Sequence, residues 1–134
     1  MARHSKLSQE PIADDDHRAF GALGEKIAAT HLGKLGYRIV TTNHRCDRGE
    51  IDIIAWDGQV LCFVEVRARR SDRFGHPLET ISAKKRQRIV AAARDYLATW
   101  RGAWPQMRFD VVGIVDGDPP QIELVRAAFE VTGT

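Results

Sequence analysis

The feature that most constrains the fold of this chain is the Asp57-Gly58 dipeptide, which lies between two segments rich in apolar and β-branched residues. Asp-Gly between alternating apolar residues is a strong signal for a two-residue β-hairpin turn. The sequence therefore predicts an antiparallel hairpin with strands at about 50–56 and 59–67. It also predicts the register, since Trp56 would then face Gln59.

This register decides which side chains share a face of the hairpin, because side chains alternate across a strand. Glu50 is expected directly opposite Glu65, with Asp52 diagonal to Glu65. The same face carries Arg67 and, nearer the turn, apolar side chains. The other face is expected to be entirely apolar and to form core: Ile51, Ile53, Ala55, Val60, Cys62, Val64 and Val66.

The crowded acids on this hairpin need an explanation, because opposed like charges destabilise a sheet. Two carboxylates about 4 Å apart repel by roughly 4 kcal/mol at an effective dielectric constant of about 20. A divalent cation would offset that repulsion, and Mg²⁺ is typically held by one or two carboxylates together with waters and phosphate. We therefore expect Asp52 and Glu65 to bind Mg²⁺ or Mn²⁺, with Glu50 as a further or water-mediated ligand. The alternative is an ion-pair network in which Arg67 and other basic residues neutralise the acids.

The rest of the chain shows helix and strand patterns without internal repeats or linkers. Residues 1–15 lack periodicity and are expected to form a mobile tail, and residues 16–134 to form a single domain. The predicted elements are a helix at 16–35, a strand at 37–42, a polar loop at 43–49, the hairpin, a basic loop at 68–80, a helix at 82–100 capped by Ser82, and strands at 108–115 and 121–126. The order α-β-β-β-α-β-β predicts an α/β fold with one mixed sheet flanked by helices.

Composition is typical of an ordinary globular protein, with 43% hydrophobic and 28% charged residues in 134. No apolar stretch approaches the roughly 20 residues that span a bilayer, and residues 1–16 lack the apolar segment of a secretory signal. The two cysteines cannot form the disulfide framework of a small secreted protein. We therefore expect a cytoplasmic protein that does not act at a membrane. The histidines show no metal-ligand spacing that favours a zinc site, and the serines have no evident base partner.

Charge is distributed unevenly along the chain, although the net charge is only +2. The segment 67–88 holds eight of the 20 Lys and Arg residues but only two of the 18 Asp and Glu residues. Such asymmetry suggests a basic surface for a polyanion. Several of these cations follow Ser82, where they oppose the helix dipole but would suit a bound phosphate. Nucleic-acid phosphates are thus expected at Arg69, Arg70, Arg73, Lys84, Lys85 and Arg88, the alternative being a solvated charged face.

Two motifs resemble the signature of the PD-(D/E)XK nuclease superfamily, namely Gly-Glu-Ile-Asp-Ile-Ile-Ala at 49–55 and Phe-Val-Glu-Val-Arg at 63–67. More narrowly, the chain resembles the YraN-type family of uncharacterised bacterial proteins over about residues 18–115. Further matching positions are Gly24-Glu25, Phe74-Gly75, Lys84 and the segment 108–112.

The resemblance implies a restriction-endonuclease-like fold, close to that of Holliday-junction resolvases, and a carboxylate-bound metal that activates water to attack a phosphodiester. By this resemblance Asp52 and Glu65 are the metal ligands, and Glu25 completes the site. Arg67 falls where the superfamily has a lysine. Arginine is charged at every accessible pH, so it cannot act as a base, although it can clamp a phosphate. A homodimer is implied only because resolvase-like relatives act as dimers, since no residue pattern here fixes an interface.

Two functions therefore remain open at the level of sequence. One is a metal-dependent endonuclease that acts on structured or branched nucleic acid, with DNA favoured over RNA. The other is a binding module of the same fold that holds nucleic acid without cutting, or cuts only with a partner. The acidic cluster favours the first function, and Arg67 favours the second.

Overall fold

The computed structural model describes residues 14–71 and 81–130, and in the first helix it describes side chains from Phe20 onward. The elements are α2 (Asp14–Lys34), β1 (Arg38–Cys46), β2 (Gly49–Asp57), β3 (Val60–Arg69), α3 (Ala83–Leu97), β4 (Gln106–Val115) and β5 (Gln121–Phe129). This order confirms the predicted α-β-β-β-α-β-β arrangement. Within the described part of the chain no helix is long and apolar enough to cross a membrane.

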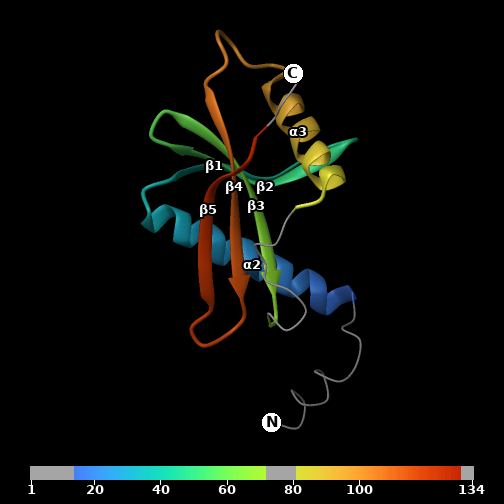
Figure 1. Ribbon diagram of the computed structural model, residues 1–134, viewed down its shortest axis with the longest axis vertical. Helices are drawn as coiled ribbons and strands as arrows, with labels where there is room; N and C mark the ends of the chain where they lie inside the picture. The colour runs from blue at the N-terminus through green and yellow to red at the C-terminus, as the bar shows by residue number, and fades with distance from the viewer. Residues whose placement is uncertain (1–13, 72–80, 131–134) are drawn as a thin grey trace.

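A single five-stranded sheet organises the molecule, in the order β1-β2-β3-β4-β5. β3 and β4 are parallel and the other neighbours are antiparallel, so the sheet is mixed as predicted. Parallel neighbours need a crossover connection, and α3 lies within it. Figure 1 shows α2 crossing the strands, while α3 lies at the upper right, beside β1 and β2.

Each helix covers its own part of the hydrophobic core. Ala28 and Leu32 of α2 pack against Ile53 and Val64, and this cluster extends to Val112 on β4. On the other side, α3 packs onto the second face of the same strands through Ile89, Ala92, Ala93 and Leu97. Both faces of the β2–β3 hairpin therefore contribute to the core along its middle, and Asp52 and Glu65 lie toward its open end.

Two predicted boundaries at the start of the domain are wrong. The first helix begins at Asp14, so the last two residues of the predicted tail are helical, and the first 13 residues lie outside the described part. Acidic residues at 14–16 suit a helix start, because they complement the positive end of its dipole. The predicted loop at 43–49 is mostly strand: β1 continues to Cys46, which pairs with Gly49. Its polar side chains are compatible with an edge strand that is solvated.

The hairpin forms with a shifted register. Asp57 pairs with Val60, so the two-residue turn is Gly58-Gln59 rather than Asp57-Gly58. Gly58 has φ +60°, and a glycine at the first central position is typical of a type II′ turn. Because both strands shift by one position, the same side chains still share a face. The pairing of the acids changes, however, since continuing this register by one residue beyond Ile53 places Asp52 directly opposite Glu65.

One residue of the predicted apolar face packs elsewhere. Ile51 is buried, but it lies in the cluster beneath α3 rather than with Ile53 and Ala55. The pairing of β2 with β3 ends at Ile53, whereas β2 continues to pair with β1 as far as Gly49. The two strands of the hairpin therefore separate at Asp52, and the end of β2 turns toward α3.

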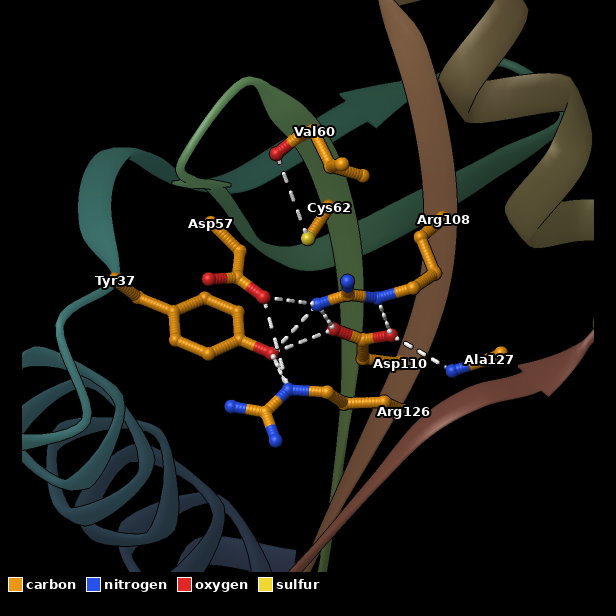
Figure 2. Close-up of polar contacts among 8 residues, drawn as sticks. All are labelled: Tyr37, Asp57, Val60, Cys62, Arg108, Asp110, Arg126 and Ala127. Atoms are coloured by element: carbon orange, nitrogen blue, oxygen red, sulfur yellow. Dashed lines mark hydrogen bonds and ion pairs between the residues drawn. The ribbon is translucent and has the colours of Figure 1, made fainter.

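A buried polar network joins the strands near the hairpin turn (Figure 2). The carboxylate of Asp110 is fully buried and accepts hydrogen bonds from Arg108 Nε at 2.8 Å, Tyr37 Oη at 2.9 Å and Ala127 N at 3.0 Å. Arg108 also donates to Asp57 at 2.8 Å. Arg108 and Asp110 thus serve pairing within the sheet, and the Arg108 guanidinium holds the pKa of Asp110 below its usual value despite burial.

Candidate functional site

The centre of the candidate site is the carboxylate pair Asp52 and Glu65, at the point where β2 and β3 separate. Asp52 Oδ2 accepts a hydrogen bond from the backbone N–H of Val66 at 2.7 Å, so its side chain reaches across the hairpin. Glu65 is 8% exposed and shares a side-chain hydrogen bond with Asp52. Burial and the charge of Glu65 raise the pKa of Asp52 to about 8. Burial and the neighbouring charge therefore favour the protonated form of Asp52.

Glu25 approaches this pair from α2, as the family resemblance implies. The side chain of Asn43 on β1 lies near the Glu25 carboxyl and lowers its pKa. Burial raises the pKa of Glu25, and the charge of Asp52 raises it further, which places Glu25 within the field of the pair. α2 comes this close because a Cβ at Gly24 would lie 2.9 Å from Cβ of Ala68, so only glycine fits there without a shift.

Lys85 reaches the pair from α3. Its Nζ lies 3.3 Å from Glu65 Oε2, which joins the start of α3 to β3 by an ion pair with one buried partner. Ser82 caps this helix as predicted, since its hydroxyl accepts a hydrogen bond from Lys85 N at 3.1 Å. The cap fixes the first turn of α3, and with it the origin of the Lys85 side chain.

An open cleft of about 540 Å³, here named the first cleft, lies over these groups. Glu25, Glu65 and Lys85 line it, and Asp52 lies against Glu65 and Val66, which also line it. The remaining lining residues come from α2, the end of β3 and the segment before α3, and they include Arg67 and Arg69. The first cleft therefore combines acids, cations and open access.

The predicted phosphate-binding residues are distributed over this region unequally. Arg69 lines the first cleft, while the exposed Arg70 places its guanidinium 5.2 Å from the ring centre of Phe20, another lining residue. Lys84 is exposed and lines neither this cleft nor the one described next. Arg73 lies outside the described residues.

Glu50, the predicted third ligand, lies farther from the centre. It is exposed and forms an ion pair with Arg45 at 3.1 Å between Nε and Oε2. It lines a separate hollow of about 350 Å³, here named the second cleft, together with Arg45, Cys46, Asp47, Gly49, Lys85, Arg88 and Ile89. Glu50 nevertheless contributes to the raised pKa values of Asp52 and Glu25, so its charge still acts on the site.

The donor set can be tested for its fit to a divalent metal. Among residues 14–71 and 81–130, no three His, Cys, Asp or Glu side chains are placed to hold one ion together. Asp52 and Glu65 form a pair whose mutual repulsion is visible in the raised pKa of Asp52. A pair of carboxylates with open space beside it fits Mg²⁺ or Mn²⁺, which keep several water or phosphate ligands.

Sequence reasoning missed two contributors and placed a third differently. The sequence predicts a loop at Asn43 and Arg45 and gives neither residue a role in the site. Lys85 was predicted to bind phosphate, but its ammonium group lies against Glu65. A signal for Lys85 exists in the sequence: it is three residues after the cap Ser82, in the turn of α3 that begins beside the sheet. Nothing local marks Asn43 or Arg45, because their partners are on other elements.

The fold and the site define a class of protein: an α/β domain that presents a partly buried carboxylate pair at a cleft lined by both acids and cations. Within that class the chain belongs to the uncharacterised protein family UPF0102, whose model matches residues 24–114. This confirms the narrower of the two resemblances, to the YraN-type family of uncharacterised bacterial proteins.

Several relatives match nearly the whole domain. The chain is similar to the UPF0102 protein CT2262 of Chlorobaculum tepidum, with 47% identity over 118 residues that cover 83% of this chain and 92% of that protein. It is also similar to a UPF0102 protein of Anaeromyxobacter dehalogenans, with 45% identity over 120 residues, 89% of this chain and 90% of that one. A UPF0102 protein of Nocardia farcinica is 46% identical over 116 residues, covering 85% and 91%.

Proposed function

We propose that this protein is a metal-dependent endonuclease of the PD-(D/E)XK type that hydrolyses phosphodiesters in nucleic acid, with structured or branched DNA as the favoured substrate. The observation that carries the proposal is the Asp52–Glu65 pair. The buried Glu65 and the partly buried Asp52 lie together at the open end of a hairpin, beneath a cleft that also holds Glu25, Lys85 and Arg67. The raised pKa of Asp52 shows an electrostatic cost that a divalent cation would remove.

Each residue has a role that follows from its position. Asp52 and Glu65 would hold Mg²⁺ or Mn²⁺, and the Val66 N–H orients the Asp52 carboxylate. Such an ion, when bound, lowers the pKa of a coordinated water and neutralises charge on the phosphate. Glu25, oriented by Asn43, faces the same space and accepts a hydrogen bond from the attacking water. Glu50 adds negative charge at the rim, through water.

The cations of the first cleft bind the substrate. Arg67 lines the cleft two residues after Glu65 in the chain, and its planar guanidinium suits bidentate contact with a phosphate. Because residue 67 is an arginine, the ammonium group at the site comes from Lys85 instead, whose Nζ lies 3.3 Å from Glu65 Oε2. Arg69 also lines the first cleft, and Arg70 lies beside it at Phe20, so both are positioned to meet the nucleic-acid backbone. No base-reading pattern is visible, so recognition rests on backbone and shape.

A binding module of the same fold is the second candidate, and Arg67 is the observation that favours it. Arginine at this position cannot take a proton from water. Lys85 pairs with Glu65 in the structure, which in the absence of a competing metal leaves the site as an ion-pair network. On this alternative the clefts hold nucleic acid, and no bond is cut.

The test is incubation with branched, duplex and single-stranded DNA in Mg²⁺ or Mn²⁺, comparing wild type with Asp52→Asn. We expect metal-dependent cleavage by wild type and a loss of about 10²-fold or more in the variant, because an essential ligand is removed. Equal product from both proteins would assign the activity to a contaminant and favour the binding module. Calorimetric titration with Mn²⁺ checks the metal separately, and absence of heat at millimolar concentration would contradict the proposal.

A further inference from the structure

We propose that the second cleft binds a phosphate of the same nucleic-acid strand that occupies the first cleft, one position along its backbone. The inference deepens the proposed function and rests on it. It assigns Arg45 and Arg88, from opposite walls of the second cleft, as the residues that hold this phosphate.

The walls of the second cleft are held at a fixed separation. One wall is the β1–β2 turn, and the other is the first half of α3. A Cβ at Gly49 would overlap the backbone carbonyl of Arg88, so the turn and the helix touch backbone to backbone at this point. Contact of this kind fixes the backbone on both sides of the cleft, which lowers the cost of binding a ligand between Arg45 and Arg88.

Cations outnumber carboxylates among the residues that line the second cleft. Three cations line it, Arg45, Lys85 and Arg88, against the two carboxylates Asp47 and Glu50. The Arg45–Glu50 ion pair at 3.1 Å balances one carboxylate, and the Lys85 ammonium group is shared with Glu65 of the first cleft. Arg45 and Arg88 therefore supply the guanidinium groups that a phosphodiester would meet in this cleft. The Arg45 side chain is 73% exposed, so it can turn toward a ligand without losing a buried contact.

The two clefts are continuous through Lys85, which lines both of them. Its ammonium group lies at Glu65 in the first cleft, while its backbone precedes Arg88 by one turn of helix. A strand that passes Lys85 therefore moves directly from the carboxylate pair to Arg88. This path differs from the one expected from sequence, because it adds Arg45 and leaves out Lys84.

The experiment measures binding of a labelled four-way DNA junction as a function of salt for wild type, Arg88→Ala and Arg45→Ala. The matched control is Arg94→Ala, an exposed arginine in the last turn of α3 that lines neither cleft. Each phosphate contact adds about 0.9 to the slope of log affinity against log salt. We expect the slope to fall by about 1 in Arg88→Ala, by a similar or smaller amount in Arg45→Ala, and not at all in the control.

A second measurement uses a dinucleotide, whose single phosphate fills the first cleft alone. We expect wild type and Arg88→Ala to bind it equally, which a general loss of fold or charge would not produce. An unchanged slope in Arg88→Ala, or an equal fall in Arg94→Ala, overturns the proposal that the second cleft binds a phosphate. The proposed function still stands in that case if wild type binds and cleaves DNA. If wild type binds no DNA, the proposed function and this inference fail together.

Discussion

The Asp52 carboxyl retains its proton far above the pH at which an aspartate ordinarily loses it, because it is buried and faces Glu65. The unfolded chain releases that proton near pH 3.8, the ordinary value for the group. The folded protein binds it up to a pH of about 8. Since the folded state binds the proton more tightly, Asp52 favours folding fully below pH 3.8, and this contribution is lost progressively as the pH rises to about 8.

The corresponding prediction concerns metal-free protein. The free energy of unfolding, measured by urea titration with a chelator present, should fall between about pH 4 and pH 8 more steeply in wild type than in Asp52→Asn. Asp47→Asn changes an exposed carboxylate of the β1–β2 turn and should leave the wild-type slope in place. If Asp52→Asn leaves the pH dependence of the unfolding free energy unchanged, the proton taken up on folding is not bound by Asp52.

Lys85 yields a prediction with two opposite signs. Its ammonium group neutralises Glu65 at 3.3 Å, so Lys85→Ala should bind Mn²⁺ several-fold more tightly in calorimetry. Cleavage should nevertheless fall by about 10²-fold, because a charge-stabilising group at the phosphate is lost. The neighbouring variant Lys84→Ala should change neither quantity, as Lys84 lines neither cleft. Weaker metal binding together with lost cleavage would reduce Lys85 to a structural role.

At the scale of elements, two glycines set the distance of each helix from the sheet. Gly24 brings α2 against Ala68 on β3, and Gly49 brings the start of β2 against the backbone of Arg88 on α3. His44 on β1 adds a contact to Asp95 on α3 at 3.0 Å. The clefts are the spaces left beside these contacts, so the geometry of the site depends on them.

Substitution of Gly49 by alanine should therefore lower the free energy of unfolding, whereas the same change at Gly33 in α2 should not. Gly49→Ala forces a methyl group into the carbonyl of Arg88 and should destabilise the protein by about 1–3 kcal/mol, as overpacking typically does. Gly33→Ala is the control, because nothing lies within 4 Å of the added Cβ and alanine favours a helix by about 0.5–1 kcal/mol. Urea denaturation compares the free energies of unfolding of the two variants. Equal values would show that the close contact at Gly49 does not constrain the residue at this position.

At the scale of the whole molecule, the network in Figure 2 joins segments that are far apart in the chain. Arg108 bonds Asp57 at the end of β2, Asp110 on its own strand and the Tyr37 hydroxyl that follows α2. On β5, Ala127 donates its N–H to Asp110, where the pairing of β4 with β5 changes register. The network therefore links β2, β4, β5 and the residue before β1. It lies at the turn end of β2, away from Asp52.

Removal of Arg108 should destabilise the fold without altering the candidate site. Arg108→Ala leaves the fully buried Asp110 carboxylate without its main partner, and breaking a buried pair typically costs about 3–5 kcal/mol. Arg126→Ala removes a half-exposed guanidinium that bonds the same Tyr37 and should cost much less. Thermal unfolding ranks the two variants. Mn²⁺ affinity should match wild type in both, and a large change in Arg108→Ala would link the network to the clefts.

The fold is predictable from sequence where the local pattern of apolar and polar residues is regular. The hairpin, the cap at Ser82 and the order of elements follow from alternation, turn chemistry and capping, all of which act within a few residues. The turn was misplaced by one position, because Asp57 is held as a strand residue by Arg108, whose position in the sequence gives no sign of the contact. Ile51 was assigned to the wrong cluster for a similar reason, since only the approach of α3 bends the end of β2.

By itself, the sequence determined that Asp52 and Glu65 share one face of a hairpin, because the side-chain period of a strand is two and survives a paired shift of register. Only the tertiary structure decided what surrounds them. Glu25 and Lys85 arrive from helices, while Glu50 pairs with Arg45 at the rim. These placements depend on how closely α2 and α3 pack at Gly24 and Gly49, and packing between distant segments is not encoded in any local pattern.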